Sequence, residues 1–106
     1  GLLVIEPIPG WQFFNKAQGF VDHTYKDIRD LIRRDRNHPS VIMWETTLNE
    51  SWPPKSWKDQ AVRIAHEEFP GDQCYTSGDT YGYDGFDVCY NDWKEGYNNF
   101  KTGIYP

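Results

Sequence analysis

The centre of the chain reads RDRNHPSVIMWETTLNE from Arg34 to Glu50. Pro39 follows a basic helical segment and favours an extended backbone at the residue before it. An apolar run then starts at Val41 and continues to about Asn49. Because this run does not alternate with polar residues, it predicts a strand that is buried on both faces, as in a parallel sheet. The strand would deliver an amide, Asn49, and a carboxylate, Glu50, to its carboxyl end.

Strand and helix patterns alternate on both sides of this stretch. Apolar runs between breakers predict strands over residues 2–6, 41–49, 73–77 and 86–91. Amphipathic patterns predict helices over residues 24–36 and 56–68. This order predicts right-handed crossovers and a parallel sheet. Antiparallel pairing of the last two strands is the open alternative, because a connection of about ten residues is barely long enough for a parallel crossover.

Each predicted helix has one apolar face. Together with Trp44 these faces are expected to form the core, and they consist of Val21, Tyr25, Ile28, Leu31 and Ile32 and of Trp57, Ala61, Ile64, Ala65 and Phe69. Capping-box patterns predict that the helices begin at Thr24, with Asp27, and at Ser56, with Asp59. The arginines within residues 33–36 are expected to compensate the dipole at the end of the first helix.

Other polar positions also have structural interpretations. His38 lies at the amino end of the central strand, and we expect it to pack and to form hydrogen bonds. Glu6 ends the first strand and is expected to organise hydrogen bonds rather than to catalyse. Cys74 and Cys89 begin neighbouring strands and are predicted to be buried free thiols.

The composition argues against several classes of partner. The chain has 106 residues, with 11 Lys and Arg against 16 Asp and Glu, for a formal net charge of −5. Nucleic acids and anionic membranes both need a cationic face, so neither is expected as a partner. The aspartates of the late loop lack calcium-binding spacing, and we expect neither a metal nor a cofactor. Aromatic residues make up 17% of the chain, which suits a surface that stacks sugars.

The carboxyl end of the central strand is the place where chemistry is expected. In parallel α/β folds ligands bind at the carboxyl ends of the strands. A carboxyl group that leaves an apolar strand beside aromatic residues such as Trp52 and Trp57 would be partly desolvated. Desolvation favours the protonated form, which a general acid needs near neutral pH.

Residues 37–50 resemble the acid/base signature of glycoside hydrolase family 2, the group of β-galactosidases, β-glucuronidases and β-mannosidases. That signature has Asn-His-Pro-Ser, three apolar residues, Trp, a short spacer and Asn-Glu, and this chain matches it with the longer of two usual spacers. The opening LLVIEPIPGWQFF is similar to the preceding strand of bacterial members, and DVCYN at residues 87–91 is similar to a later strand. One departure is Glu45, where the family usually has Ser or Gly.

The resemblance implies a retaining glycosidase on a (β/α)8 TIM barrel. Residues 1–106 would be a partial α/β barrel, a fragment with about strands 3–6 and two intervening helices, since a full barrel takes roughly 250 residues. By the resemblance, Glu50 is the general acid/base and Asn49 contacts the sugar 2-hydroxyl. The nucleophile would be a second Glu from strand seven, outside this chain, so we expect the isolated chain to be inactive.

Further sugar contacts are expected around Glu50, from Trp52, Trp11, Trp93 and Asn91. The expected partners are a β-glycoside and the remainder of the barrel, together with self-association through exposed sheet edges. Two alternatives stay open. The chain could be a carbohydrate-binding α/β domain without turnover, or a self-contained α/β interaction protein that has to protect two sheet edges.

Overall fold

Four parallel strands in chain order make one sheet within the part of the chain that the computed structural model describes, residues 1–9, 13–47, 51–77 and 85–89. The elements are β1 (Val4–Pro7), α1 (Gln18–Asp35), β2 (Val41–Glu45), α2 (Lys55–Glu68), β3 (Cys74–Ser77) and β4 (Val88–Cys89). Every neighbouring pair is parallel. The expected parallel sheet is confirmed, and the antiparallel alternative for the last two strands is wrong.

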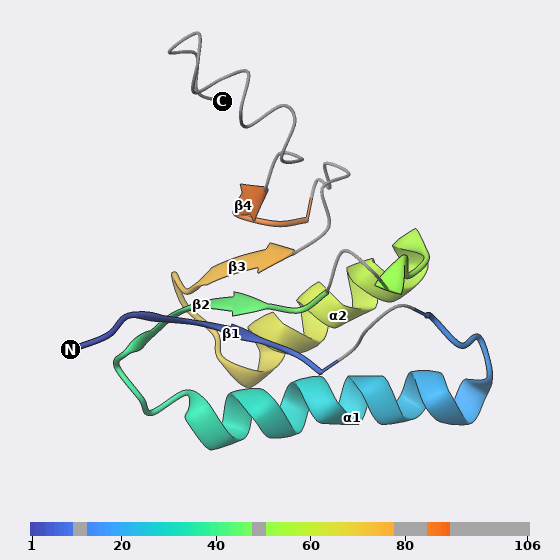
Figure 1. Cartoon of the computed structure of the whole chain (residues 1–106), viewed down its shortest axis with the longest axis horizontal. Helices are drawn as coiled ribbons and strands as arrows, with labels where there is room; N and C mark the ends of the chain where they lie inside the picture. Colours follow the sequence, from blue (N-terminus) through green and yellow to red (C-terminus); the bar gives the residue numbers. More distant parts are fainter. Residues whose placement is uncertain (10–12, 48–50, 78–84, 90–106) are drawn as a thin grey trace, which may run out of the picture.

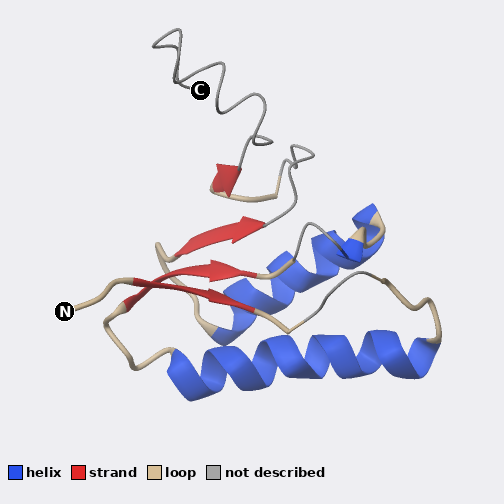
Figure 2. Cartoon of the chain, in the orientation of Figure 1, coloured by secondary structure: helices blue, strands red, loops and turns tan. Residues whose placement is uncertain are grey.

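Both helices cover the same face of the sheet (Figures 1 and 2). Trp44 of β2 and Tyr75 of β3 are paired in register, and both side chains are buried against the helices. Trp44 packs edge to face on Phe69 at the end of α2. The predicted apolar faces of the two helices form this core, with Ile28, Ile32, Trp57, Ala61, Ile64 and Ala65 buried and Val21, Tyr25, Leu31 and Phe69 packed around them.

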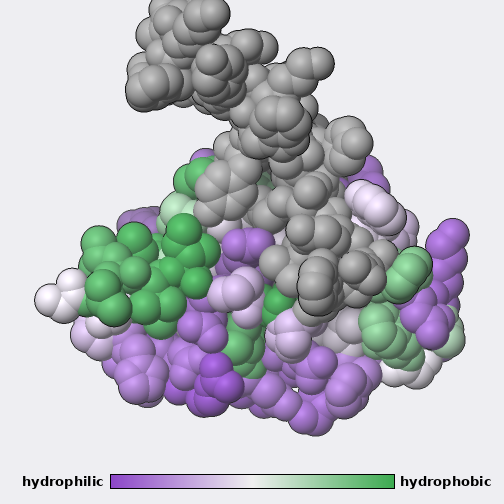
Figure 3. Space-filling model, viewed as in Figure 1, coloured by the Kyte–Doolittle hydropathy of each residue, from purple (hydrophilic) through white to green (hydrophobic). Residues whose placement is uncertain are grey.

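The prediction that the strands are buried on both faces is wrong for β1 and β2. Ile5 is 42% exposed, Ile42 46%, and the preceding Leu2 and Leu3 83% and 73%. The two helices cover one face of the sheet and leave these side chains partly or largely exposed (Figure 1). The space-filling view shows an apolar surface over the beginning of β1 (Figure 3).

The two helices begin earlier than the capping-box patterns predict. Helix α1 starts at Gln18 after Ala17, and Thr24 lies within it. Helix α2 starts at Lys55 after Pro54, and Ser56 lies within its first turn. Neither N-cap residue, Ala17 or Pro54, makes a side-chain capping hydrogen bond. The Thr24 hydroxyl instead accepts a hydrogen bond from the indole Nε1 of Trp57 at 2.9 Å, so a contact between the helices replaces the expected cap.

His38 does not pack as predicted. Its side chain is 68% exposed, and its Nε2 lies 4.0 Å from a carboxylate oxygen of Asp35. Its backbone is what the turn uses: the His38 amide donates to the carbonyl of Asp35, and its carbonyl accepts from the amide of Val41. The turn into β2 therefore holds the histidine by its main chain and leaves the ring in solvent. Neither helix of the described ranges has the length and apolar character of a membrane span.

Candidate active site

The carboxyl ends of β1, β2 and β3 lie side by side, and the candidate site is built there (Figure 1). The ladder continues past the strands, because the Ile8 amide donates to the carbonyl of Glu45 at 3.0 Å and the Thr46 amide to that of Thr76 at 3.1 Å. These bonds extend the pairing of the strands by one residue past the ends of β1 and β2. Thr46 and Thr47 are each 1% exposed, and residues 48–50 follow them directly.

Trp52 is the predicted site residue that the structure describes. Its side chain is 66% exposed, and its backbone φ of 45° lies in the left-handed region. Residues other than glycine seldom adopt that conformation, which here belongs to the turn between β2 and α2. The exposed indole is free of core packing. The other predicted site residues lie outside the described residues: Trp11, Asn49, Glu50, Asn91 and Trp93.

A small apolar pocket lies beside the end of β2. It is lined by the segment that follows β1, by the first half of α1, and by the residues between β2 and the first turn of α2, and its cavity volume is about 40 Å³. Such a volume is far below the roughly 300–1,000 Å³ of a typical ligand site. The pocket is lined by Ile8, Pro9, Phe13, Phe14, Phe20, Thr24, Thr47, Ser51, Pro53 and Trp57.

Aromatic rings in edge-to-face contact form one wall of the pocket. The ring of Phe14 meets that of Trp57 at 5.5 Å and an angle of 70°, and that of Phe20 at 6.0 Å and 87°. Tyr25 stacks on Trp57 with a centroid distance of 5.9 Å and an interplanar angle of 15°. Edge-to-face and offset contacts of this kind are favourable because the positive edge of one ring meets the negative face of another. No spacing in the sequence predicted these partners.

Two further side chains lie close to the end of β2. Glu45 is half-buried and pairs in register with Pro7 and Thr76, on the face of the sheet opposite to Trp44. The Thr46 hydroxyl is buried and has no hydrogen-bond partner among the described residues. Within those residues no group of three or more His, Cys, Asp or Glu side chains is arranged to hold a metal ion.

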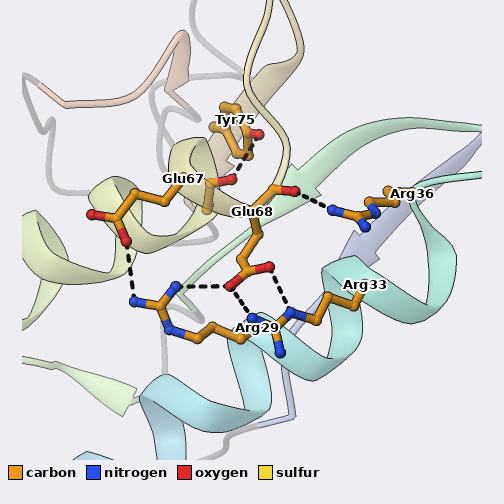
Figure 4. Close-up of polar contacts among 7 residues, drawn as sticks. Arg29, Arg33, Arg36, Glu67, Glu68 and Tyr75 are labelled. Atoms are coloured by element: carbon orange, nitrogen blue, oxygen red, sulfur yellow. Dashed lines mark hydrogen bonds and ion pairs between the residues drawn. The ribbon is translucent and has the colours of Figure 1, made fainter.

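A network of charges joins α1 to the carboxyl end of α2 (Figure 4). Glu68 of α2 is 8% exposed and accepts hydrogen bonds from Arg33 at 2.7 and 2.9 Å and from Arg29 at 2.8 Å. These bonds, those of Arg33 above all, lower the pKa of the Glu68 carboxyl. Arg29 also binds Glu67 at 3.1 Å, and Arg36 donates to the Glu68 carbonyl at 2.7 Å.

This network went unpredicted, because the helix pattern indicates only a local role for the arginines at the helix end. Both glutamates of α2 serve as partners of arginines, so neither faces the carboxyl ends of the strands. Glu6 behaves as an organiser, since it forms an ion pair with Arg34 of α1 at 3.3 Å. Cys74 is a free thiol whose pKa burial raises, so it stays protonated near neutral pH. The side chain of Cys89 lies outside the described residues.

Comparison with known proteins gives the geometry its context. The model of the glycosyl hydrolases family 2 TIM barrel domain matches residues 6–69. A β-galactosidase of Thermoanaerobacterium thermosulfurigenes is 40% identical over 70 residues, which cover 66% of this chain and 10% of that protein. A β-galactosidase of Thermoanaerobacter pseudethanolicus is 37% identical over 67 residues, which cover 63% of this chain and 9% of that protein.

A solved structure with the same fold is the apo form of Bacteroides uniformis β-glucuronidase 3. It aligns with a TM-score of 0.64 and 24% identity, over 73% of this chain and 11% of that one. The chain thus spans about a tenth of the length of the relatives it matches. The parallel sheet with helices on one face is a part of an α/β barrel. Because the family model covers more than half of its residues, the chain belongs to glycosyl hydrolase family 2, within the TIM barrel domain.

Proposed function

We propose that this chain is the acid/base segment of a retaining β-glycosidase. Glu50 protonates the glycosidic oxygen as the leaving group departs and then takes a proton from the incoming water. Asn49 hydrogen-bonds the sugar 2-hydroxyl, a contact that strengthens in the transition state. The observation that carries the proposal is the family match over residues 6–69, since it includes the motif from Asn37 to Glu50.

The fold supports this assignment through the position of the motif. Strand β2 precedes residues 48–50, and its carboxyl end lies between those of β1 and β3. Active sites of TIM barrels lie at this end of the strands. A residue that follows β2 by a few positions is therefore where a barrel enzyme would place a catalytic group.

The nucleophile is proposed to come from outside the 106 residues. Retention requires a second carboxylate about 5–5.5 Å from the acid/base. Glu67 and Glu68 are bound by arginines between the helices. Glu95, the remaining glutamate after Glu50, lies outside the described residues. We propose a barrel glutamate encoded beyond this segment.

The remaining sugar contacts are proposed for aromatic and amide side chains near the strand ends. The exposed indole of Trp52 offers a flat apolar face, on which the C–H side of a sugar ring can stack. Trp11, Asn91 and Trp93 are proposed as additional contacts on the sequence alone. The substrate is a β-glycoside, and the galactoside configuration is taken from the names of two relatives.

The test uses the longer barrel protein that contains this segment, with Glu50→Gln. Without a general acid, kcat/KM for an alkyl β-galactoside should fall by roughly 10²–10⁴-fold. A dinitrophenyl β-galactoside should lose much less in its first step, because that leaving group departs without a proton. Azide should then accelerate turnover and give the β-galactosyl azide, since azide attacks the glycosyl enzyme without a base.

The matched control is Glu67→Gln, a carboxylate on α2 that is 52% exposed. It should leave both substrates unaffected. Equal losses on alkyl and aryl substrates, with no effect of azide, would remove Glu50 from the acid/base role.

The 106-residue chain alone gives a second test. Without a nucleophile it should show no turnover of an aryl β-galactoside above the uncatalysed rate. Turnover that Glu50→Gln abolishes would contradict the proposal that the nucleophile lies elsewhere. Sugar binding with a Glu50 side chain that titrates like a free glutamate would favour the carbohydrate-binding alternative instead.

A further inference from the structure

Glu45 places a carboxylate at the carboxyl end of the sheet, at a position where the family 2 signature usually has Ser or Gly. It is the last residue of β2. Trp44, the residue before it, is buried against the helices, and side chains alternate along a strand. The Glu45 side chain therefore lies on the face away from the helices. Because the helices of a TIM barrel lie outside its sheet, this face is the interior of the barrel.

Glu45 belongs to a row of side chains that crosses the sheet at this end. Its register partners are Pro7 of β1 and Thr76 of β3, and Thr76 pairs in turn with Val88 of β4. Within this row Glu45 is the side chain that carries a charge near neutral pH. In a TIM barrel the interior layer at the carboxyl ends of the strands lies directly below the active-site loops. In the proposed enzyme the charge of Glu45 therefore lies below the sugar site.

The half-buried position of Glu45 lets its charge act over a longer distance than a surface charge would. Protein surroundings screen a charge less than water does, so its field extends to groups that it does not contact. Two like charges about 10 Å apart in such surroundings repel each other enough to change an equilibrium constant roughly tenfold. A neutral sugar meets no such repulsion, and its hydroxyls can donate hydrogen bonds to a carboxylate.

The relatives of this chain include two enzymes named for a neutral sugar, the β-galactosidases, and one named for a sugar acid, the β-glucuronidase. A uronide carries a carboxylate at the carbon where a galactoside carries a neutral hydroxymethyl group. We infer that Glu45 is a specificity residue that excludes β-uronides by like-charge repulsion and restricts the enzyme to neutral β-glycosides. The inference rests on the proposed function for the place of the sugar.

The experiment uses the longer barrel protein and two matched pairs of nitrophenyl substrates, β-galactoside with β-galacturonide and β-glucoside with β-glucuronide. The members of a pair share configuration and leaving group, and only the uronide is charged. Glu45→Gln should raise kcat/KM for the uronide roughly tenfold relative to its neutral partner. Where uronide turnover is too slow to measure, its inhibition constant against the neutral substrate replaces kcat/KM. Any effect of Glu45 on the acid/base itself cancels in this ratio.

Three further variants separate charge from shape and from net charge. Glu45→Asp keeps the carboxylate and should leave the ratio within about twofold of the parent value. Glu45→Ser introduces a residue that the family usually has there and should raise the ratio as Glu45→Gln does. Glu67→Gln removes a carboxylate on α2 that is 52% exposed and should not change the ratio. An unchanged ratio in the Gln and Ser variants of Glu45, or an equal rise in Glu45→Asp or Glu67→Gln, would overturn the inference.

Azide rescue of Glu50→Gln judges the proposed function separately. If the rescue fails while Glu45→Gln still raises the uronide ratio, Glu50 is not the acid/base and Glu45 still selects against charged sugars. If the rescue succeeds and Glu45→Gln leaves the ratio unchanged, the specificity role of Glu45 alone is wrong.

Discussion

Tyr75 links the sheet to the end of helix α2 through a single hydroxyl. The side chain is fully buried, and its hydroxyl donates to the carbonyls of Phe69 at 2.8 Å and Ala65 at 3.1 Å. Phe69 caps α2, and its amide donates to the Ala65 carbonyl at 3.0 Å, whereas the Phe69 carbonyl lies past the last helical bond. The side chain therefore serves as a cap that is supplied by a strand.

Tyr75→Phe should lower the free energy of unfolding by about 1–2 kcal/mol, because the Phe69 carbonyl loses the hydroxyl that donates to it. Urea unfolding followed by circular dichroism measures this loss. The matched control is Tyr25→Phe, whose hydroxyl has no hydrogen bond to a described residue and whose ring stacks on Trp57. A loss at Tyr25 as large as that at Tyr75 would contradict the capping role.

The same residue should make stability depend on alkaline pH. Burial, with a smaller contribution from the charge of Asp87, raises the pKa of Tyr75 from 10.0 to about 12. The unfolded chain loses this proton first, so the stabilisation is complete below pH 10 and declines as the pH rises through about 12. A shift of this size corresponds to about 2–3 kcal/mol. Between pH 9 and 11 the urea midpoint of Tyr75→Phe should fall less steeply than that of the parent chain. Equal slopes for the two chains would show that Tyr75 does not cause the alkaline loss of stability.

At the scale of elements, the ion pairs of Glu68 decide how the two helices meet. Its carboxylate is 8% exposed and contacts Arg29 and Arg33, whose side chains are 33% and 57% exposed. Because the arginines keep much of their water, the bonds are worth less than in a dry core. Their geometry still fixes α2 against α1, since Arg33 binds both carboxylate oxygens.

Glu68→Gln should cost about 1–2 kcal/mol, because hydrogen bonds to a buried charge are lost. Glu67→Gln, at a carboxylate that is 52% exposed with one contact, should cost less than about 0.5 kcal/mol. Urea unfolding at pH 7 compares the two variants. Equal losses would mean that burial of Glu68 adds nothing to its ion pairs.

The ion pairs of Glu68 should also make the free energy of unfolding depend on pH in the acidic range. The pKa of Glu68 is lowered from 4.5 in the folded chain, chiefly by its hydrogen bonds to Arg33. Its contribution is therefore present above about pH 4.5 and is lost as the pH falls through the folded-state value. The difference in stability between the parent chain and Glu68→Gln should shrink below that pH. A constant difference down to pH 2 would contradict this.

At the scale of the molecule, the sheet is open in two ways. Strands β1 and β4 are its outer strands within the described residues, and the face away from the helices carries Ile5 and other apolar side chains. Unpaired strand edges template pairing with another chain. In a complete barrel both the edges and the open face would be covered by other strands.

The isolated 106-residue chain should therefore self-associate, with an average mass in light scattering that rises with concentration. Leu3→Lys, beside the edge of β1, should reduce this association, because a charge on an edge opposes pairing. His23→Lys, on a side chain of α1 that is 71% exposed, is the control and should have no effect. A strictly monomeric chain at high concentration would contradict this prediction.

Local pattern determined the order of the elements, the parallel pairing of the first three strands and the apolar faces of both helices, and the structure decided that the last pair is parallel as well. Periodicity and connection rules act over a few residues, so they can be read along the chain, and the motif from Asn37 to Glu50 gave the family in the same way. The candidate site could be predicted only as far as this motif reaches. The pairing of Phe14 with Phe20 and Trp57 had no local signal.

Only the tertiary structure decided the contacts that cross between elements. Thr24 looked like a cap, yet its hydroxyl binds Trp57, which lies 33 residues away in the chain. Arg29 and Glu68 are 39 residues apart and meet because α1 and α2 pack on the same face of the sheet. Such partners depend on how whole elements pack, which residue spacing does not encode. The exposure of Ile5 also depends on packing. The apolar pattern of a strand does not show which of its faces another element covers, and in this chain the helices cover one face only (Figure 1).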